Sequence, residues 1–196
     1  MSNRVAGLAV LVGGVLVALN YLFWTGNGLA PDRISAEPNT FGGQLVLLAI
    51  GGGTLLLTLG MPTLMQRQRR LGQTGVVGGW LLVFGFLLWA LAALAGTSLL
   101  ELPLWVGMAD QVLVVIGSVL FGVASYEAGA LPRWGALGVA IFGLVGLLPS
   151  AVPDLLFFLA GVDVNTGEAL REMGYLALLL FGLAWAWLGY SVFQRS

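Results

Sequence analysis

Long apolar stretches separated by short polar segments make up almost the whole chain. Most of the stretches hold about 20 residues, which is enough to cross the ~30 Å hydrocarbon core of a bilayer as a helix. The pattern therefore predicts a single membrane domain over residues 1–196 with six spans, at approximately 5–24, 41–64, 75–95, 104–126, 134–150 and 174–193.

The fifth stretch is the exception, because its uninterrupted part, 134–148, is short for a span. Pro149 and Pro153 follow it, and the apolar run then continues through DLLFFLAG. Proline removes a helix hydrogen bond and clashes with the preceding turn. Two alternatives remain: the helix kinks and continues to about Ala160, or it stops and a short interfacial helix follows. The predicted fold is an all-α integral membrane protein, a six-helix bundle whose fifth helix is short or broken at these prolines.

Composition agrees with a membrane protein and narrows its chemistry. The chain is 59% hydrophobic and 9% charged, whereas soluble domains carry about 25% charged residues. It has no cysteine, histidine or lysine. These absences exclude disulfides, thiolate nucleophiles, a histidine general base, cysteine or histidine metal sites and a Schiff base. We expect no cofactor, no metal site and no nucleic-acid partner.

The arginines predict the orientation of the chain. With six spans, both termini and the second and fourth loops share one side of the membrane. That side holds six of the eight basic residues: Arg4, Arg67, Arg69, Arg70, Arg133 and Arg195. The other side holds Arg33 and Arg171 and all the acidic residues except Glu127. The positive-inside rule then predicts a multi-pass protein of the plasma membrane with both termini in the cytoplasm.

The one cluster of charge is QRQRRLGQ at 66–73, with Arg67, Arg69 and Arg70. It could bind anionic lipid headgroups or a cytoplasmic partner, or it could only anchor the topology. Three arginines fall below the four to eight basic residues typical of a lipid-recognition cluster, so the pattern favours the topology anchor.

Glycine is spread through the spans, with 30 residues in the chain. Gly51, Gly52 and Gly53 are consecutive within the second span, and Gly75 and Gly79 form a GxxxG pattern in the third. Small residues allow helix backbones to approach closely, although glycine also weakens a helix and could make a hinge. The pattern favours packing.

Asp110 is the charged residue that the pattern places inside a span. At 100° per residue, the arc that holds the small and polar residues covers about a third of the fourth helix and contains Asp110 together with Gly107, Val114, Gly117, Ser118, Phe121 and Ser125. The opposite arc carries Val112, Val115, Ile116, Val119 and Val123. The first arc is predicted to point into the bundle and the second into lipid.

Two interpretations of Asp110 remain open. In the functional one, it lines an outward-facing polar cavity that binds a cation, a proton or a polar group of a substrate. In the structural one, which the shallow depth favours, it bonds to a neighbouring helix or caps the first turn. The candidate cavity residues are Asp110, Gln111, Ser118, Arg33 and Arg171, and the further neutral candidates are Asn20, Tyr21 and Gln44.

The segment EAGALPRWGALGVAIFGLVGLL, 127–148, carries a resemblance. Its turn, AGALPRW at 128–134, resembles the AGxLPRW turn between late helices of small multi-spanning prokaryotic membrane proteins classed as domains of unknown function. The resemblance implies the same multi-spanning architecture. It implies no activity.

Three hypotheses for function follow from the sequence. The leading one is a non-enzymatic membrane component that packs with lipids, with other membrane proteins or with copies of itself. The alternative is a small permease or channel-like protein with an outward-facing cavity around Asp110. A weaker third hypothesis is a lipid-modifying enzyme that uses outer carboxylates such as Glu101, Asp154 and Asp163.

Overall fold

The computed structural model describes residues 2–28, 41–67, 71–97, 103–129, 131–160 and 168–195. This part of the chain contains six helices and no strand: α1 (Asn3–Gly28), α2 (Phe41–Arg67), α3 (Gly72–Thr97), α4 (Leu104–Ala128), α5 (Arg133–Ala160) and α6 (Glu168–Gln194). Five of them, all except α5, contain a described stretch long and apolar enough to cross a membrane. The chain is an all-helical, multi-pass membrane protein, as its hydrophobic pattern predicts.

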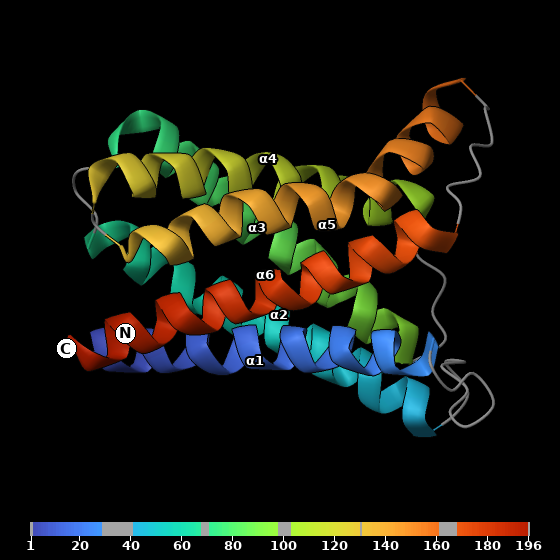
Figure 1. Cartoon of the computed structure of the whole chain (residues 1–196), viewed down its shortest axis with the longest axis horizontal. Helices are drawn as coiled ribbons and strands as arrows, with labels where there is room; N and C mark the ends of the chain where they lie inside the picture. The colour runs from blue at the N-terminus through green and yellow to red at the C-terminus, as the bar shows by residue number, and fades with distance from the viewer. Residues whose placement is uncertain are drawn as a thin grey trace.

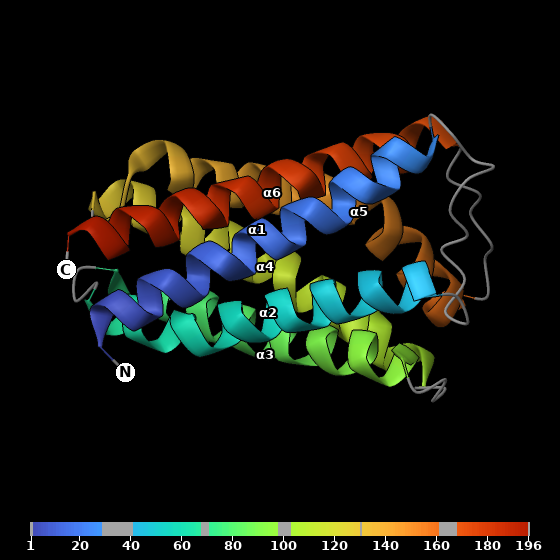
Figure 2. The ribbon, with the colours of Figure 1, turned by 90° about the horizontal axis from the view of Figure 1, so that it is seen from below.

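The six helices form a closed ring in the order of the chain. Each helix packs against its neighbours in sequence, and α6 returns to pack against α1 (Figures 1 and 2). No other pair of helices brings its described Cα atoms within 8 Å. Both termini lie at the same end of the ring, here called the terminal end (Figure 1). Side chains, rather than backbone contacts, therefore fill the axis of the ring.

Helix α5 resolves the two alternatives for the fifth stretch. It is one helix of 28 residues that continues past Pro149 and Pro153 to Ala160. The prediction that it is short and stops at the prolines is wrong, and the alternative of a kinked helix that continues agrees with the structure. The C-terminal part of α5 bends away from the bundle (Figure 1), as expected where proline removes a backbone hydrogen bond.

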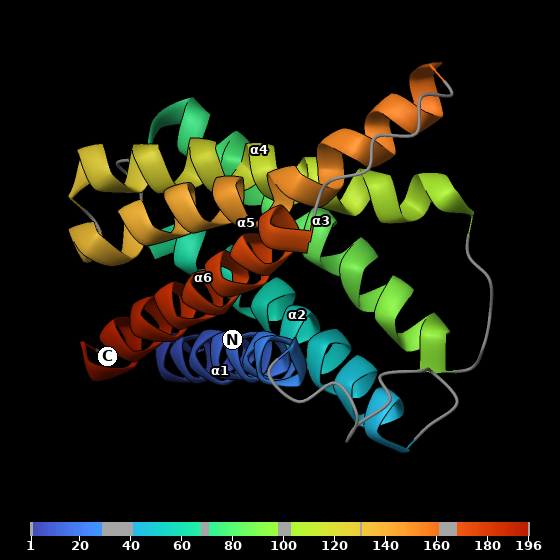
Figure 3. The same ribbon diagram turned by 45° about the vertical axis from the view of Figure 1, so that its right-hand side comes forward.

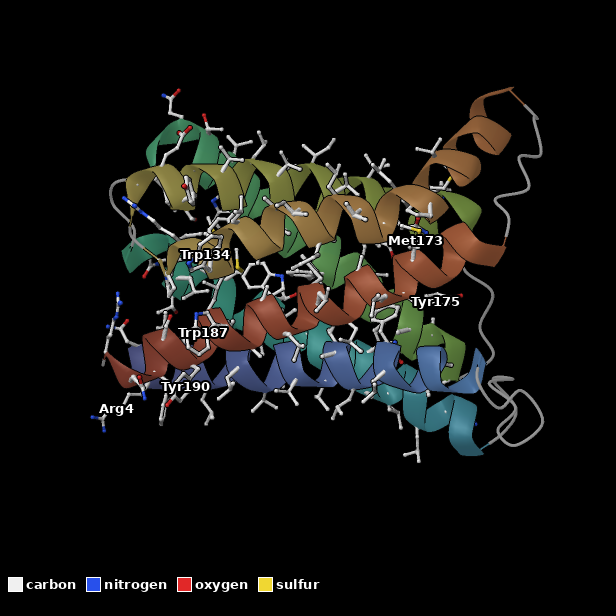
Figure 4. The ribbon with its side chains drawn as sticks, in the orientation of Figure 1. Arg4, Trp134, Met173, Tyr175, Trp187 and Tyr190 are labelled. Carbon is white, nitrogen blue, oxygen red and sulfur yellow. The ribbon has the colours of Figure 1, made fainter. Side chains whose placement is uncertain are left out.

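The outer surface of the ring is apolar, and the exposed charges lie near the terminal end. Large aliphatic and aromatic side chains such as Leu19, Leu48, Phe84 and Leu176 are about half exposed. Arg4, Trp134, Trp187 and Tyr190 lie toward the terminal end (Figure 4). Of the charged side chains that the structure describes, four are exposed and Asp110 alone is buried; the four are Arg4, Glu127, Arg133 and Arg195.

The two faces predicted for α4 agree with the structure. Asp110, Val114, Ser118, Phe121 and Ser125 are all buried, with exposed fractions of 0 to 5%. On the opposite arc, Ile116 and Val123 are exposed, and Val112, Val115 and Val119 are half-buried. The helical period of the sequence therefore identifies the side of α4 that faces the axis of the ring.

Glycine residues set the distance between α1 and α6. Gly7 lies against Gly189, and Gly14 against Gly182, so two pairs spaced seven residues apart face each other on antiparallel helices. A Cβ atom on Gly182 would lie 2.5 Å from the backbone nitrogen of Ala18 and 2.7 Å from the carbonyl oxygen of Gly14. No side chain fits between these backbones. We call this line of contact the α1–α6 glycine seam.

Glycine fills the same role at other helix contacts. The α3–α4 glycine seam is made by Gly78 and Gly85 of α3 and Gly117 of α4, each of which faces backbone atoms of the partner helix. In the glycine triplet, Gly51 faces Leu94 of α3 and Gly53 faces Gly13 of α1, whereas Gly52 faces open space. In the GxxxG pattern of α3, Gly75 packs against Ala124 and Gly79 packs against Met65. The prediction that these glycines mark packing contacts is confirmed for all of them except Gly52.

Substitution of Gly182 by alanine tests the α1–α6 glycine seam. We expect Gly182→Ala to lower the free energy of unfolding by about 1–3 kcal/mol, because the new methyl group forces two backbones apart. The matched control is Gly52→Ala, whose Cβ has nothing within 4 Å; it should keep or raise stability because alanine favours helix. Thermal unfolding in detergent measures both. Equal midpoints for the two variants would contradict the seam.

Candidate functional site

A cleft of about 410 Å³ lies at the axis of the ring. All six helices contribute residues to it: Asn20 and Tyr21 from α1, Val46, Leu47 and Ile50 from α2, Trp89, Ala92 and Ala93 from α3, Gly107, Asp110 and Gln111 from α4, Leu147 from α5, and Tyr175 and Leu178 from α6. These positions lie near the helix ends remote from the termini. The cleft is therefore in the half of the ring that faces away from the terminal end, where Tyr175 lies (Figure 4).

The polar side chains of the cleft come from neighbouring and from opposite helices of the ring. The rings of Tyr21 and Tyr175 stack with their centroids 6.2 Å apart and an interplanar angle of 29°. Tyr21 of α1 and Asp110 of α4 both line the cleft. Because α1 and α4 are opposite members of the ring, the cleft separates the side chains of two helices that share no close backbone contact.

The spacing of the α1–α6 glycine seam explains where the two tyrosines lie. On α1 the sequence Gly7, Gly14, Tyr21 advances by seven residues, and on α6 Tyr175, Gly182, Gly189 does the same. Each tyrosine therefore occupies the next position of the seam, where a side chain of its size cannot enter a contact between backbones. The seam ends there, and the two aromatic rings become part of the cleft lining.

The α3–α4 glycine seam ends at a similar depth. Gly85 of α3 packs on the backbone of Val114 of α4, and one turn further from the terminal end Trp89 and Asp110 line the cleft. Beyond this point α3 and α4 diverge (Figures 1 and 3). The cleft thus begins where close glycine contact ceases on two sides of the ring.

Four aromatic side chains fill the axis on the terminal side of the cleft. Trp185 stacks on Phe121 at 5.9 Å, and meets Phe86 and Phe181 edge-on at 5.7 and 6.1 Å. All four are fully buried. They come from α3, α4 and α6, so they close the axis between opposite helices. We call this group the aromatic floor.

The structure brings only some of the predicted site residues together. Asp110 and Gln111 line the cleft with Asn20 and Tyr21, whereas Ser118 lies apart from it, buried against Gly143 of α5. Gln44 is exposed and does not line the cleft. The remaining predicted residues lie outside the described residues or have side chains outside them: Arg33, Arg69, Arg70, Arg67 and Arg171.

The structure excludes one of the structural interpretations of Asp110. Helix α4 begins at Leu104 after Pro103, and its first turn contains no acidic residue. Asp110 is in the second turn and is 5% exposed. It therefore does not cap the helix.

The described lining of the cleft holds a single carboxyl group. Asp110 is the only titratable carboxyl group among the described residues that line it, so a second carboxylate for paired acid–base work is missing from this lining. The described residues also hold no group of three or more aspartate or glutamate side chains that could bind a metal ion. Glu101 and Asp163, and the side chain of Asp154, lie outside the described part.

Trp89 and Tyr175 line the cleft but are absent from the cavity residues predicted from the sequence. The signal that could have found Tyr175 is the seven-residue spacing of glycine and tyrosine in the first and last apolar stretches. Comparison with known proteins adds no relative: no protein-family model, curated protein or solved structure matches the chain. The resemblance at the AGALPRW turn stays a prediction.

The depth of the cleft can be measured by cysteine labelling, because the chain has no native cysteine. We expect a membrane-impermeant thiol reagent to label Gly107→Cys and Gln111→Cys, which line the cleft. Val114→Cys and Ser118→Cys should stay unlabelled although they share the face of α4, because both positions are 0% exposed. Labelling of Ser118→Cys at the rate of Gly107→Cys would show that the cleft extends beyond Asp110 to the level of the aromatic floor. Ile116→Cys, on the lipid side, is the control for reagent that enters from the bilayer.

Proposed function

We propose that the protein is a six-span permease-type membrane protein whose central cleft binds a small polar solute from outside the cell. This proposal takes up the second of the sequence hypotheses, a small permease or channel-like protein. The single observation that carries it is the cleft at the ring axis, to which all six helices contribute and which holds the one buried charged side chain among those described. Its volume lies within the range of about 300–1,000 Å³ typical of small-molecule sites.

The position of the cleft supports solute binding rather than a purely structural role for Asp110. An ionisable side chain within the membrane is expensive, and such residues line solute and ion pathways in many membrane proteins. A contact that only joined two helices would need no cavity beside it. Here the carboxyl group borders a space large enough for a solute.

The aromatic floor supports an outward-facing state. The cleft lies at the level of Asp110 in the half of the ring remote from the termini, and the four rings lie next to it toward the terminal end. A permease exposes its site to one side at a time, with binding near the middle of the membrane. In this proposal the floor is the closed inner barrier.

The proposed topology has six spans, with the terminal end in the cytoplasm of a prokaryotic cell. Arg4, Arg133 and Arg195 lie at this end, which agrees with the positive-inside rule. Helix α5 completes the sixth span over its full 28 residues, about 42 Å at 1.5 Å per residue. The cleft then faces the outside of the plasma membrane.

Labelling from the two sides of the membrane tests this topology. In intact cells, we expect an impermeant thiol reagent to label Gly107→Cys and to leave Gln194→Cys unlabelled, because the two positions lie at opposite ends of the ring. After the membrane is permeabilised, Gln194→Cys should also react, since this residue is exposed. The reverse pattern in intact cells would place the terminal end outside.

A solute screen tests the binding function. A solute that binds only the folded protein stabilises it by about 2.7 kcal/mol at 100 times its Kd. We expect at least one small polar solute to raise the unfolding midpoint of the purified protein in detergent and to leave that of Asp110→Asn unchanged. Glu127→Gln, an exposed substitution remote from the cleft, should respond like the unmodified protein. Equal responses from the Asp110→Asn protein would remove Asp110 from the binding site.

A further inference from the structure

The groups that line the cleft select the charge of a solute. The carboxyl group of Asp110 and the Oδ1 atom of Asn20 both accept hydrogen bonds. Asn20 is 4% exposed, and its Oδ1 atom has no hydrogen-bond partner among the described residues. No arginine is among the described residues of the lining. A ligand that carries positive charge and N–H donors would be attracted by the carboxylate and could donate to Oδ1 of Asn20, whereas an anion would meet like charge.

The aromatic side chains of the cleft favour the same charge. Trp89 and the stacked rings of Tyr21 and Tyr175 all line it. The face of an aromatic ring carries partial negative charge, so it attracts an ammonium group, and tryptophan attracts it best. Three such rings beside one carboxyl group are a common surrounding for an organic cation.

The aliphatic part of the lining distinguishes an organic cation from a metal ion. Leu47, Ile50, Leu147 and Leu178 supply apolar surface. A hard metal ion needs several oxygen ligands, six to eight for Ca²⁺, and the described residues offer no cluster of acidic side chains for one. An apolar solute body, in contrast, gains from contact with this surface.

We propose that the cleft binds a small organic ammonium ion, with its N–H groups toward Asp110 and Asn20 and its apolar body against Trp89 and the leucines. This inference rests on the proposed function, because it names the class of solute for the same site. The property that distinguishes this inference is that the solute must carry positive charge.

Protection of a cysteine in the cleft from thiol labelling tests whether the solute must carry positive charge. Gly107→Cys is suited to the purpose, because a Cβ at Gly107 meets nothing within 4 Å and the position lines the cleft. The probes are 2-phenylethylammonium, neutral 2-phenylethanol and anionic 3-phenylpropanoate, which share a phenyl ring and differ in charge. We expect only the ammonium ion to slow labelling, by about tenfold at ten times its Kd.

Substitutions in the Gly107→Cys background identify the groups that bind the probe. Asp110→Asn should weaken protection by about 30-fold or more, since it removes the buried partner of the cation. Trp89→Leu should weaken it by about two- to fivefold, and it provides a second variant if Asp110→Asn fails to fold. Glu127→Gln should leave protection unchanged. Unfolding midpoints in detergent check that each variant is folded.

The outcomes separate this inference from the proposed function. Equal protection by all three probes, preferential protection by 3-phenylpropanoate, or no protection at a cysteine that labels readily would overturn the ammonium inference and leave the outward cleft in place. Protection by the ammonium ion that persists in Asp110→Asn and in Trp89→Leu would also overturn it. If Gly107→Cys does not react with the reagent in any condition, the cleft is closed to the outside and the proposed function fails first.

Discussion

Close backbone contact at glycine is the constraint on which the rest of this structure depends. Apolar side chains gain little from leaving lipid, so membrane helices associate through close packing and hydrogen bonding. In this chain one such contact joins the first and last helices, at Gly14 and Gly182. That contact closes the ring, and a closed ring of six helices has an axis that only side chains can fill. The aromatic floor fills one part of this axis, and the cleft lies in the other part.

The cleft and the floor divide the axis by side-chain chemistry. Where the glycine seams end, the chain places tyrosine, tryptophan, asparagine and one aspartate around a space. Next to them, toward the terminal end, Trp185 and three phenylalanines fill the axis completely. The one buried charged side chain that the structure describes, Asp110, therefore lies at the cleft and not at the aromatic floor.

Sequence periodicity predicted the features that are set within a single helix, namely its length and its buried face. It missed the residue positions that are set by contacts between helices. The spans and the buried face of α4 follow from apolar length and a 100° period, so Asp110 was correctly aimed into the bundle. Ser118 shares that face, but Gly143 lets α5 cover it, and no pattern within α4 contains that information. Tyr175 meets Tyr21 only because the ring closes. At α5, the two prolines allowed either the end of the helix or a kink in it. The packing of α5 on α6, where Pro149 lies beside Gly174, decides for the kinked helix.

The ring closure between α1 and α6 has a consequence for biosynthesis. Gly14 and Gly182 are separated by about 170 residues, which a ribosome needs roughly 10 to 30 s to translate. During that time the glycine face of α1 has no α6 to pack against. The nascent first helix must wait within the membrane, exposed to other helices with small residues, until the sixth helix is inserted. Assembly of this protein is therefore timed by the emergence of its last helix, and a chain that terminates early leaves an unsealed surface for quality-control proteases to recognise.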